Sequence, residues 1–220
     1  MTSQQDQMIA IAMPGEEWAL EGIFLGGTGS DPYGAVVAAP HPLYGGSMDS
    51  PVVAELCFAC RRAGYATVRF NWRGVGASGG APSGDPASAD ADYAAALAYL
   101  EETVDGPILA AGYSFGAAVA VRVARANPRV RRLLLVAPPP ALLDAAALAQ
   151  FRGSALVVVG SHDSFAPSAE LASLLGDGAR RRLEVIPDAD HFFMSCGLGD
   201  ISRIAREWLE KGEKGTDLFS

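Results

Sequence analysis

Ser114 is the residue of this 220-residue chain whose surroundings most strongly suggest covalent chemistry. It interrupts the apolar run ILAAGYSFGAAVAVRV, with Gly112 two places before it and Gly116 two places after. This G-x-S-x-G spacing is typical of a strained turn that lifts a nucleophilic serine above the end of a strand. The glycines remove side chains that would collide where the strand and the next helix pass closely. A serine that only caps a core helix, the competing interpretation, would need neither glycine.

A nucleophilic serine requires a general base, and the sequence offers three histidines. His41 precedes the turn PLYGGS and His162 lies beside Asp163, so each has a plausible local role. His191 follows the last expected strand, in the segment PDADHFF, and is free to lie over the strand ends. We therefore predict that His191 is the base. The alternative is an ordinary surface-loop histidine.

A carboxylate must hold that imidazole in the correct tautomer. Asp188 and Asp190 are so near His191 in sequence that neither is well placed to reach its ring from the opposite side. Asp163 comes directly after a buried strand, which would fix it at the same edge of the sheet as Ser114. We predict Asp163 as the acid, with a turn former or helix cap as its alternative role.

Negative charge that develops on an attacked carbonyl oxygen requires two hydrogen-bond donors, an oxyanion hole. One should be the backbone N–H of Phe115, at a helix N-terminus whose dipole also favours an anion. The second should come from the segment HPLYGGS at 41–47, in which Pro42 has no N–H. We predict Leu43, with Tyr44 as the alternative donor. A plain Gly-rich turn is the competing interpretation of this segment.

Apolar and β-branched runs alternate with helical patterns along almost the whole chain. Runs such as LLLVA and ALVVVG are apolar without alternation, as strands covered on both faces should be. The rhythm predicts an α/β fold of three layers, α/β/α, around a mostly parallel sheet. We expect strands at 35–39, 66–70, 108–112, 133–137, 155–159 and 183–186. We expect helices at 51–63, 89–102, 115–125, 141–150, 168–175 and 200–211. The short connection between the fourth and fifth of these strands leaves little room for an inserted cap domain.

The size and composition of the chain favour a single domain over residues 1–220, with flexible ends at 1–7 and 212–220. Half of the residues are hydrophobic, enough to build a sizeable core. Segments 8–13 and 18–25 are expected to pair as an antiparallel hairpin at one edge of the sheet. The Gly-, Pro- and Ser-rich stretch at 78–90 is interpreted as an exposed loop because strand and helix patterns continue on both sides.

The charge balance argues against nucleic-acid and membrane partners. Lysine and arginine total 17 against 25 aspartates and glutamates, a net charge of -8, and no basic run occurs. The N-terminal MTSQQDQ has no secretory pattern and no segment is long and apolar enough to span a membrane, so we expect a cytoplasmic protein. Three cysteines are too few for a disulfide framework.

Two further patterns suggest cofactors and are interpreted as structural. Cys57 and Cys60 could form a redox pair or half a zinc site, but helical spacing places both on one apolar face beside Val53 and Leu56. The segment GVGASG at 74–79 satisfies the dinucleotide-binding fingerprint. It runs into GAPSGDPAS, which does not start a helix promptly, and no acidic residue follows at the required distance.

Taken together, these motifs resemble those of the α/β-hydrolase superfamily, and within it the small, cap-less bacterial serine hydrolases with a dienelactone-hydrolase-like core. The resemblance covers roughly residues 36–209, through the segments HPLYGGSMD, FNWRGVGASGG, GYSFG, GSHDSFAP and ADHFF. The chain order Ser114, Asp163, His191 is the order that this superfamily uses. Relatives often carry HPHP where this chain has APHP, with Ala39 in place of the first histidine. Dienelactone hydrolases use a cysteine nucleophile, so their activity is not carried over.

These observations predict a serine hydrolase that cleaves small-molecule carboxylic esters with small to medium acyl groups through an acyl-enzyme. No metal or organic cofactor is expected. Candidates to line an apolar substrate pocket, each of which could equally belong to the core, are Tyr44, Tyr113, Phe165, Phe192 and Phe193. The alternatives are a thioesterase or amidase with the same triad, or a non-catalytic binding protein on the same fold. A nucleotide-dependent reductase is a third alternative and depends on the GVGASG segment alone.

Overall fold

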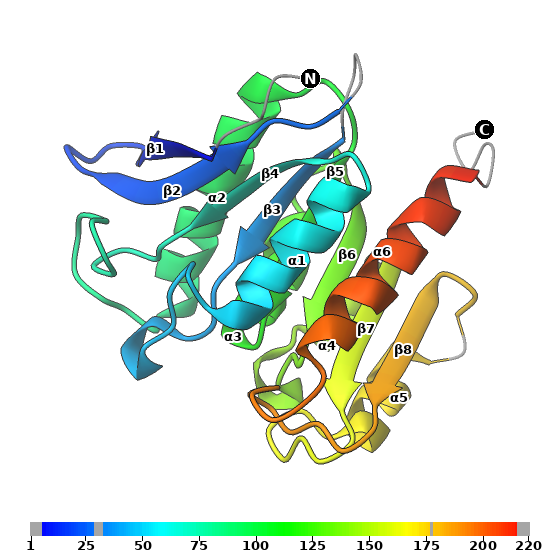
Figure 1. Cartoon of the computed structure of the whole chain (residues 1–220). Helices are drawn as coiled ribbons and strands as arrows, with labels where there is room; N and C mark the ends of the chain where they lie inside the picture. Colours follow the sequence, from blue (N-terminus) through cyan, green and yellow to red (C-terminus); the bar gives the residue numbers. More distant parts are fainter. Residues whose placement is uncertain (1–5, 29–32, 177, 215–220) are drawn as a thin grey trace.

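The computed structural model describes residues 6–28, 33–176 and 178–214, and eight strands in this part of the chain form one sheet (Figure 1). The strands are β1 (Gln7–Ala12), β2 (Ala19–Leu25), β3 (Gly34–Ala38), β4 (Ala66–Phe70), β5 (Ile108–Tyr113), β6 (Val130–Val136), β7 (Ser154–Gly160) and β8 (Arg181–Ile186). Their spatial order is β1-β2-β4-β3-β5-β6-β7-β8. All neighbours from β4 to β8 pair in parallel, whereas β1–β2 and β2–β4 pair antiparallel. The predicted mostly parallel sheet with an antiparallel hairpin at one edge is confirmed.

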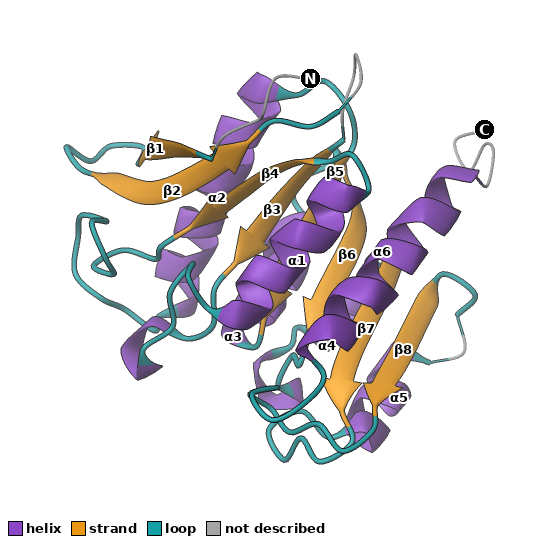
Figure 2. Ribbon diagram, viewed as in Figure 1, coloured by secondary structure: helices purple, strands orange, loops and turns teal. Residues whose placement is uncertain are grey.

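Helices cover both faces of the sheet (Figures 1 and 2). They are α1 (Pro51–Arg62), α2 (Pro86–Thr103), α3 (Phe115–Ala124), α4 (Ala145–Gln150), α5 (Ser168–Leu175) and α6 (Leu198–Lys214), with short 3-10 turns η1 (Pro42–Tyr44) and η2 (Pro140–Leu142). α1 packs against α6 on one face, and α2, α3, α4 and α5 form a row on the other. This is the predicted three-layer α/β/α architecture, and no cap domain is inserted in the part of the chain that the structure describes.

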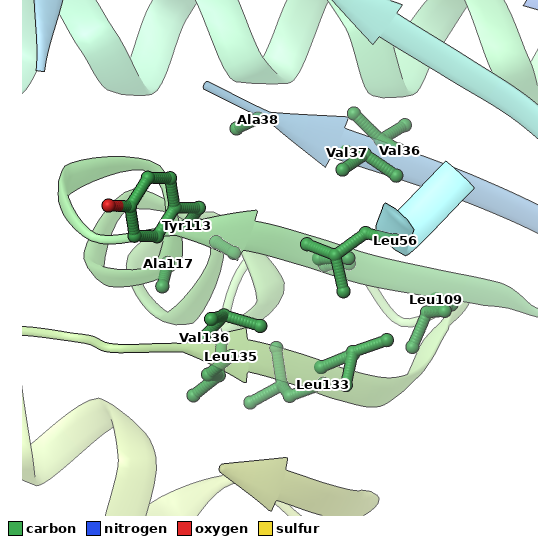
Figure 3. Packing of buried hydrophobic residues seen from close by; sticks show 14 of the residues in the cluster. Val36, Val37, Ala38, Leu56, Leu109, Tyr113, Ala117, Leu133, Leu135 and Val136 are labelled. Carbon is green, nitrogen blue, oxygen red and sulfur yellow. The ribbon is translucent and has the colours of Figure 1, made fainter. Parts of the chain in front are cut away.

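The central strands are apolar because both of their faces are covered. Every residue of β3 and of β5 is buried, as are the last four of β6. Figure 3 shows side chains of these strands, among them Val36, Leu109 and Leu135, meeting Leu56 of α1 and Ala117 of α3. The core is therefore continuous through the sheet. It fixes the carboxyl ends of β3 and β5 to β8 along one edge, where the candidate site lies.

Some local predictions differ from the structure. The helix expected at 141–150 is split, because Asp144 caps α4 by accepting a hydrogen bond from the N–H of Ala147 and only a 3-10 turn precedes it. The helix expected from residue 89 begins at Pro86, after the N-cap Asp85. Of the two ends expected to be flexible, residues 1–5 and 215–220 lie outside the described residues. Within the described part, β1 begins at Gln7 and α6 continues to Lys214.

Within the described residues, no helix has the length and apolar character needed to cross a membrane.

Candidate active site

Ser114 sits on the sharp turn between β5 and α3. Its backbone adopts φ 54° and ψ -116°, a region that L-residues rarely occupy, so the turn is strained. The side chain makes no helix-capping hydrogen bond. The backbone N–H donates to the carbonyl of Val136, at 2.8 Å, and anchors the turn to β6. The interpretation of Ser114 as a simple helix cap is therefore wrong, and its hydroxyl is free for other partners.

The two flanking glycines are required by close backbone approaches. A Cβ atom on Gly112 would lie 2.4 Å from the carbonyl carbon of Gly116, at the start of α3. A Cβ atom on Gly116 would lie 2.4 Å from the carbonyl oxygen of Ala39 and 2.7 Å from that of Ala38. The first contact lets the strand and the helix pass each other. The second brings the start of α3 beside the segment that leaves β3.

Ser114, His191 and Asp163 form one hydrogen-bonded chain. The Oγ atom of Ser114 lies 3.0 Å from Nε2 of His191. On the other side of the ring, Nδ1 lies 2.8 Å from Oδ2 and 3.0 Å from Oδ1 of Asp163. An ionised carboxylate only accepts hydrogen bonds, so Nδ1 carries the proton and Nε2 is left as the acceptor of the serine proton. All three side chains are buried.

Asp163 also shapes the loop that carries it. Its Oδ1 accepts hydrogen bonds from the backbone N–H groups of Phe165 and Ala166, at 2.9 and 2.8 Å. The two roles considered for this residue, turn former and partner of the histidine, therefore coexist in one carboxylate. The amide hydrogen bonds hold the carboxylate in place beside the imidazole.

The two other candidate carboxylates do not bond the histidine ring. Oδ1 of Asp190 accepts hydrogen bonds from the N–H groups of Phe192 and Phe193, both at 3.0 Å, and so folds the turn around His191. Asp188 is exposed and has a positive φ of 60°. Its backbone N–H donates to the hydroxyl of Ser161, at 2.9 Å. Both aspartates thus help to form the histidine loop.

Tyr113 has a role that the sequence did not indicate. We expected it to line a substrate pocket, but it is buried and its hydroxyl donates to the backbone carbonyl of His191, at 2.9 Å. Burial raises the pKa of the Tyr113 hydroxyl, and the carboxylates of Asp163 and Asp190 raise it further, so the group stays a hydrogen-bond donor. The residue next to the serine therefore ties the histidine loop to the end of β5.

The remaining aromatic candidates divide by exposure. Phe193 is buried in the core with a φ of 56° and is not available to line an open pocket. Tyr44, Phe165 and Phe192 expose 87%, 58% and 56% of their surface. The rings of Phe165 and Phe192 lie 4.9 and 5.5 Å from the His191 ring, centroid to centroid. These two phenylalanines therefore flank the histidine at the mouth of the site.

The loop expected to supply the second oxyanion donor is held by His41. The N–H of Leu43 donates to Nδ1 of His41, at 3.2 Å, and the N–H of Tyr44 donates to its carbonyl oxygen, at 3.1 Å. Both candidate donors are therefore already engaged. The backbone N–H of His41, by contrast, donates to no residue in the described part of the chain.

His41 lies directly beside the helix that follows the serine. Its ring packs against that of Phe115, with 4.6 Å between centroids, and against Tyr44, at 4.7 Å. The partly buried ring loses hydration, which lowers the pKa of His41 and favours the neutral form that accepts the Leu43 N–H. Trp72, another residue that the sequence did not single out, donates from Nε1 to the carbonyls of Ala39 and Pro40 at 3.2 and 3.0 Å and so holds the start of this loop.

The two cofactor-like patterns have structural surroundings. Gly76 of the GVGASG segment has a φ of 58° and packs against the carboxylate of Glu21, which accepts the N–H of Ala77 at 2.8 Å. The next helix in the chain, α2, begins only at Pro86, so the turn does not open directly into a helix as the fingerprint requires. Burial raises the pKa of the Cys57 thiol to about 12, and Cys60 is fully buried on the same helix. The described residues contain no group of His, Cys, Asp and Glu side chains that could hold a metal ion.

The chain resembles known hydrolases over most of its length. Residues 34–184 match the profile of the family described as Serine aminopeptidase, S33. An uncharacterised protein of Rickettsia prowazekii is 29% identical over 197 residues, which cover 84% of this chain and 82% of that protein. An alpha-beta serine hydrolase homologue from Coxiella burnetii is 30% identical, with a TM-score of 0.79 over 96% of this chain and 98% of that one.

A crystal structure from Xanthomonas campestris, described as a serine hydrolase without a lid, shares 25% identity with a TM-score of 0.81. It aligns over 96% of this chain and 97% of that one. The absence of a cap from the described part of this chain agrees with that description. The chain belongs to the Serine aminopeptidase S33 family, a group of hydrolases with the α/β-hydrolase fold.

Proposed function

We propose that the protein hydrolyses carboxylic esters through a covalent acyl-enzyme formed on Ser114. The single observation that carries the proposal is the continuous hydrogen-bond chain from Ser114 Oγ through the imidazole of His191 to the carboxylate of Asp163. A strained turn, a base within 3.0 Å and an acid on the far side of the ring are the three parts that serine acyl transfer needs.

The reaction follows from the tautomer of His191. Its Nε2 accepts the Ser114 proton while Oγ attacks the ester carbonyl carbon, whose π electrons move onto the carbonyl oxygen. The resulting imidazolium, stabilised by Asp163, returns the proton to the alcohol oxygen as the tetrahedral intermediate collapses and the C–O bond breaks. The acyl group is then bound to Oγ. Water attacks it next, with His191 again as base, and releases the acid and the free serine.

For the oxyanion we propose the backbone N–H groups of Phe115 and His41. Phe115 is the first residue of α3, so its N–H has no acceptor within the helix and points toward the helix N-terminus. The N–H of His41 is without an acceptor among the described residues, on the loop that packs against Phe115. The N–H groups of Leu43 and Tyr44, which the sequence predicted as donors, would have to break their hydrogen bonds to His41 before they could bind the oxyanion.

Two substitutions of one residue test the His41 donor. His41 has φ -62° and ψ 122°, angles that proline adopts without strain. His41→Pro removes the N–H and the ring, whereas His41→Ala removes only the ring. We expect kcat for His41→Pro to be roughly 100-fold below that of His41→Ala. Equal kcat values in the two variants would show that this N–H does not bind the oxyanion.

Thioesters and amides pass through the same intermediates, and only the leaving group distinguishes them. A non-catalytic binding protein would have no use for a strained serine that is hydrogen-bonded to an oriented histidine. The geometry of the triad therefore supports catalysis rather than binding alone. Among the three substrate classes, we propose esters.

The nucleophile is tested by steady-state hydrolysis of p-nitrophenyl butyrate. We expect turnover by the wild type and a loss of roughly 10⁴-fold or more in kcat for Ser114→Ala. Ser164→Ala, which removes an exposed serine on the loop that carries Asp163, is the matched control and should retain wild-type activity. Full activity in Ser114→Ala would mean that another residue is the nucleophile.

A further inference from the structure

The loops that follow the carboxyl ends of the parallel strands surround the triad and carry most of the exposed apolar surface. We call these five loops, at 39–50, 71–85, 137–144, 161–167 and 187–197, the rim (Figure 2, teal loops and short purple turns beyond the arrowheads of the parallel strands). Of the ten exposed large hydrophobic side chains among the described residues, six belong to the rim: Leu43, Tyr44, Leu142, Phe165, Phe192 and Met194. Of these six, Phe165 and Phe192 lie 6.3 Å apart, ring centroid to centroid, and both flank His191, so an exposed apolar surface adjoins the triad.

The charges on the rim are almost all negative. Its five loops contain six aspartates, no lysine and a single arginine, Arg73, although the chain has 17 lysines and arginines in all. That arginine is neutralised, because its guanidinium donates to the buried carboxylate of Asp92 at 2.7 and 3.0 Å and its backbone N–H donates to the same group. The rim therefore offers no unpaired lysine or arginine to an anion.

The six aspartates of the rim have different structural roles. Asp163 belongs to the triad, and Asp85, Asp144 and Asp190 accept backbone N–H groups. The two others, Asp49 and Asp188, are exposed, and their carboxylates form no hydrogen bond or ion pair within the described part of the chain. Their carboxylates are exposed on the rim and are paired with no lysine or arginine among the described residues.

Several arginines gather at the opposite edge of the sheet. There, before the amino ends of β6 and β7, a hollow of about 830 Å³ is lined by Arg125, Arg131 and Arg152 among others, with no acidic residue in its walls. The arginines of this hollow therefore lie remote from the triad, whereas the exposed carboxylates of Asp49 and Asp188 belong to the rim. Charges near a binding site steer charged ligands according to their sign before they make contact.

We propose that the substrates of this site are uncharged esters with an apolar acyl group, and that the rim rejects anionic acyl donors, including acyl-coenzyme A thioesters. The inference rests on the proposed function and assigns its substrate class. The apolar side chains beside His191 bind the acyl group, while Asp49 and Asp188 repel negative leaving groups. A carboxylate or phosphate that loses its water on binding would find no unpaired lysine or arginine on the rim.

Three esters with one acyl group and different charge test the proposal: phenyl butyrate, 4-carboxyphenyl butyrate and 4-(trimethylammonio)phenyl butyrate. At pH 8 and low salt, we expect kcat/KM for the carboxylate ester to be roughly tenfold below that of phenyl butyrate. A change in salt concentration separates the effect of the protein's charges on kcat/KM from the effect of the leaving group, because salt screens only interactions between charges. Raising NaCl from 0.02 to 0.5 M shortens the Debye length from about 20 to about 4 Å. Over this range the kcat/KM of the carboxylate ester relative to phenyl butyrate should rise, and the kcat/KM of the ammonium ester relative to phenyl butyrate should fall.

A charge variant identifies the source of the repulsion. Asp49→Asn with Asp188→Asn removes the two unpaired carboxylates, and asparagine tolerates the positive φ of residue 188. We expect the kcat/KM ratio of 4-carboxyphenyl to phenyl butyrate to rise about threefold at low salt. Glu102→Gln, at the end of α2, with Asp105→Asn, in the loop before β5, makes the same change in net charge at the opposite edge and should leave the ratio unchanged.

The outcomes are distinct. Equal and salt-independent kcat/KM for the anionic and neutral esters would overturn the inference while the esterase activity stands. An equal rise in both double variants would overturn the assignment to the rim and indicate only net charge. Absence of hydrolysis of all three esters and of p-nitrophenyl butyrate would instead overturn the proposed function, and the substrate class with it.

Discussion

The carboxylate of Asp163 shows how one side chain connects the loop with the chemistry. It accepts two backbone N–H groups of its own loop and faces Nδ1 of His191 with both oxygens. Its position at this edge of the sheet was predictable from the sequence, because parallel strands end at a common edge and this aspartate directly follows a strand. The sequence did not indicate that a tyrosine next to the serine would hold the histidine loop, since that bond joins residues 78 positions apart.

Asp163→Asn tests the acid at the scale of one atom. The amide would keep an acceptor for the loop N–H groups but would favour the wrong tautomer of His191, so we expect kcat to fall roughly 10³- to 10⁴-fold with the fold retained. Hydrolysis of p-nitrophenyl butyrate and the circular dichroism spectrum of the variant provide the measurement. Asp190→Asn is the comparison, because its amide oxygen can accept the same two backbone bonds. A larger loss of kcat in Asp190→Asn than in Asp163→Asn would show that Asp190, and not Asp163, is the partner of His191 in catalysis.

At the scale of elements, the turn between β5 and α3 is positioned by backbone contacts that leave no space for a side chain. The glycine pattern made this turn predictable, because only glycine allows the strand, the helix and the segment after β3 to approach so closely. The loop after β3 was less predictable. Which of its N–H groups stays unbonded depends on the 3-10 turn that His41 caps, and residue types alone do not reveal that turn.

Gly116→Ala tests this close packing. The added Cβ would meet two backbone carbonyls that have no room to move, so we expect a loss of about 2 kcal/mol in the free energy of unfolding. The melting temperature should fall by roughly 4–8 °C. Gly199→Ala, in α6, is the matched control, because a Cβ there has no neighbour within 4 Å, and it should melt at or above the wild-type temperature. A melting temperature for Gly116→Ala equal to that of the wild type would contradict the crowding described here.

The exposed ring of Phe192, beside His191, should contact the acyl chain of the substrate, so its contribution to kcat/KM should depend on acyl length. Phe192→Ser removes a ring that exposes 56% of its surface next to the histidine, whereas Phe58→Ser removes one of similar exposure on α1. We expect Phe192→Ser to lower kcat/KM for p-nitrophenyl hexanoate three- to tenfold more than for p-nitrophenyl acetate, since roughly one or two methylene contacts are lost. Phe58→Ser should not change this ratio. Identical ratios in both variants would remove Phe192 from the acyl-binding surface.

For the whole molecule, the regular part of the fold was predictable because burial on both faces requires uninterrupted apolar strands. Strands β3 to β7 lie where their apolar runs do, and the hairpin of β1 and β2 was evident from its position. The helix expected at 141–150 was not predicted correctly, because the hydrogen bond from Ala147 to Asp144 starts the helix later than apolar periodicity suggests. The lack of an unpaired lysine or arginine on the rim also required the structure, since it depends on which loops follow which strand ends and on the pairing of Arg73 with Asp92.

The most direct test of the whole account is the site of covalent labelling by a fluorophosphonate. The reagent phosphonylates only a serine whose hydroxyl is activated by a neighbouring base, so intact-mass measurement followed by peptide mapping identifies the nucleophile. We predict a single adduct on the peptide that contains Ser114, lost in Ser114→Ala and much slower to form when His191 is replaced by alanine. Absence of labelling in the wild type, or an adduct on another serine, would contradict it.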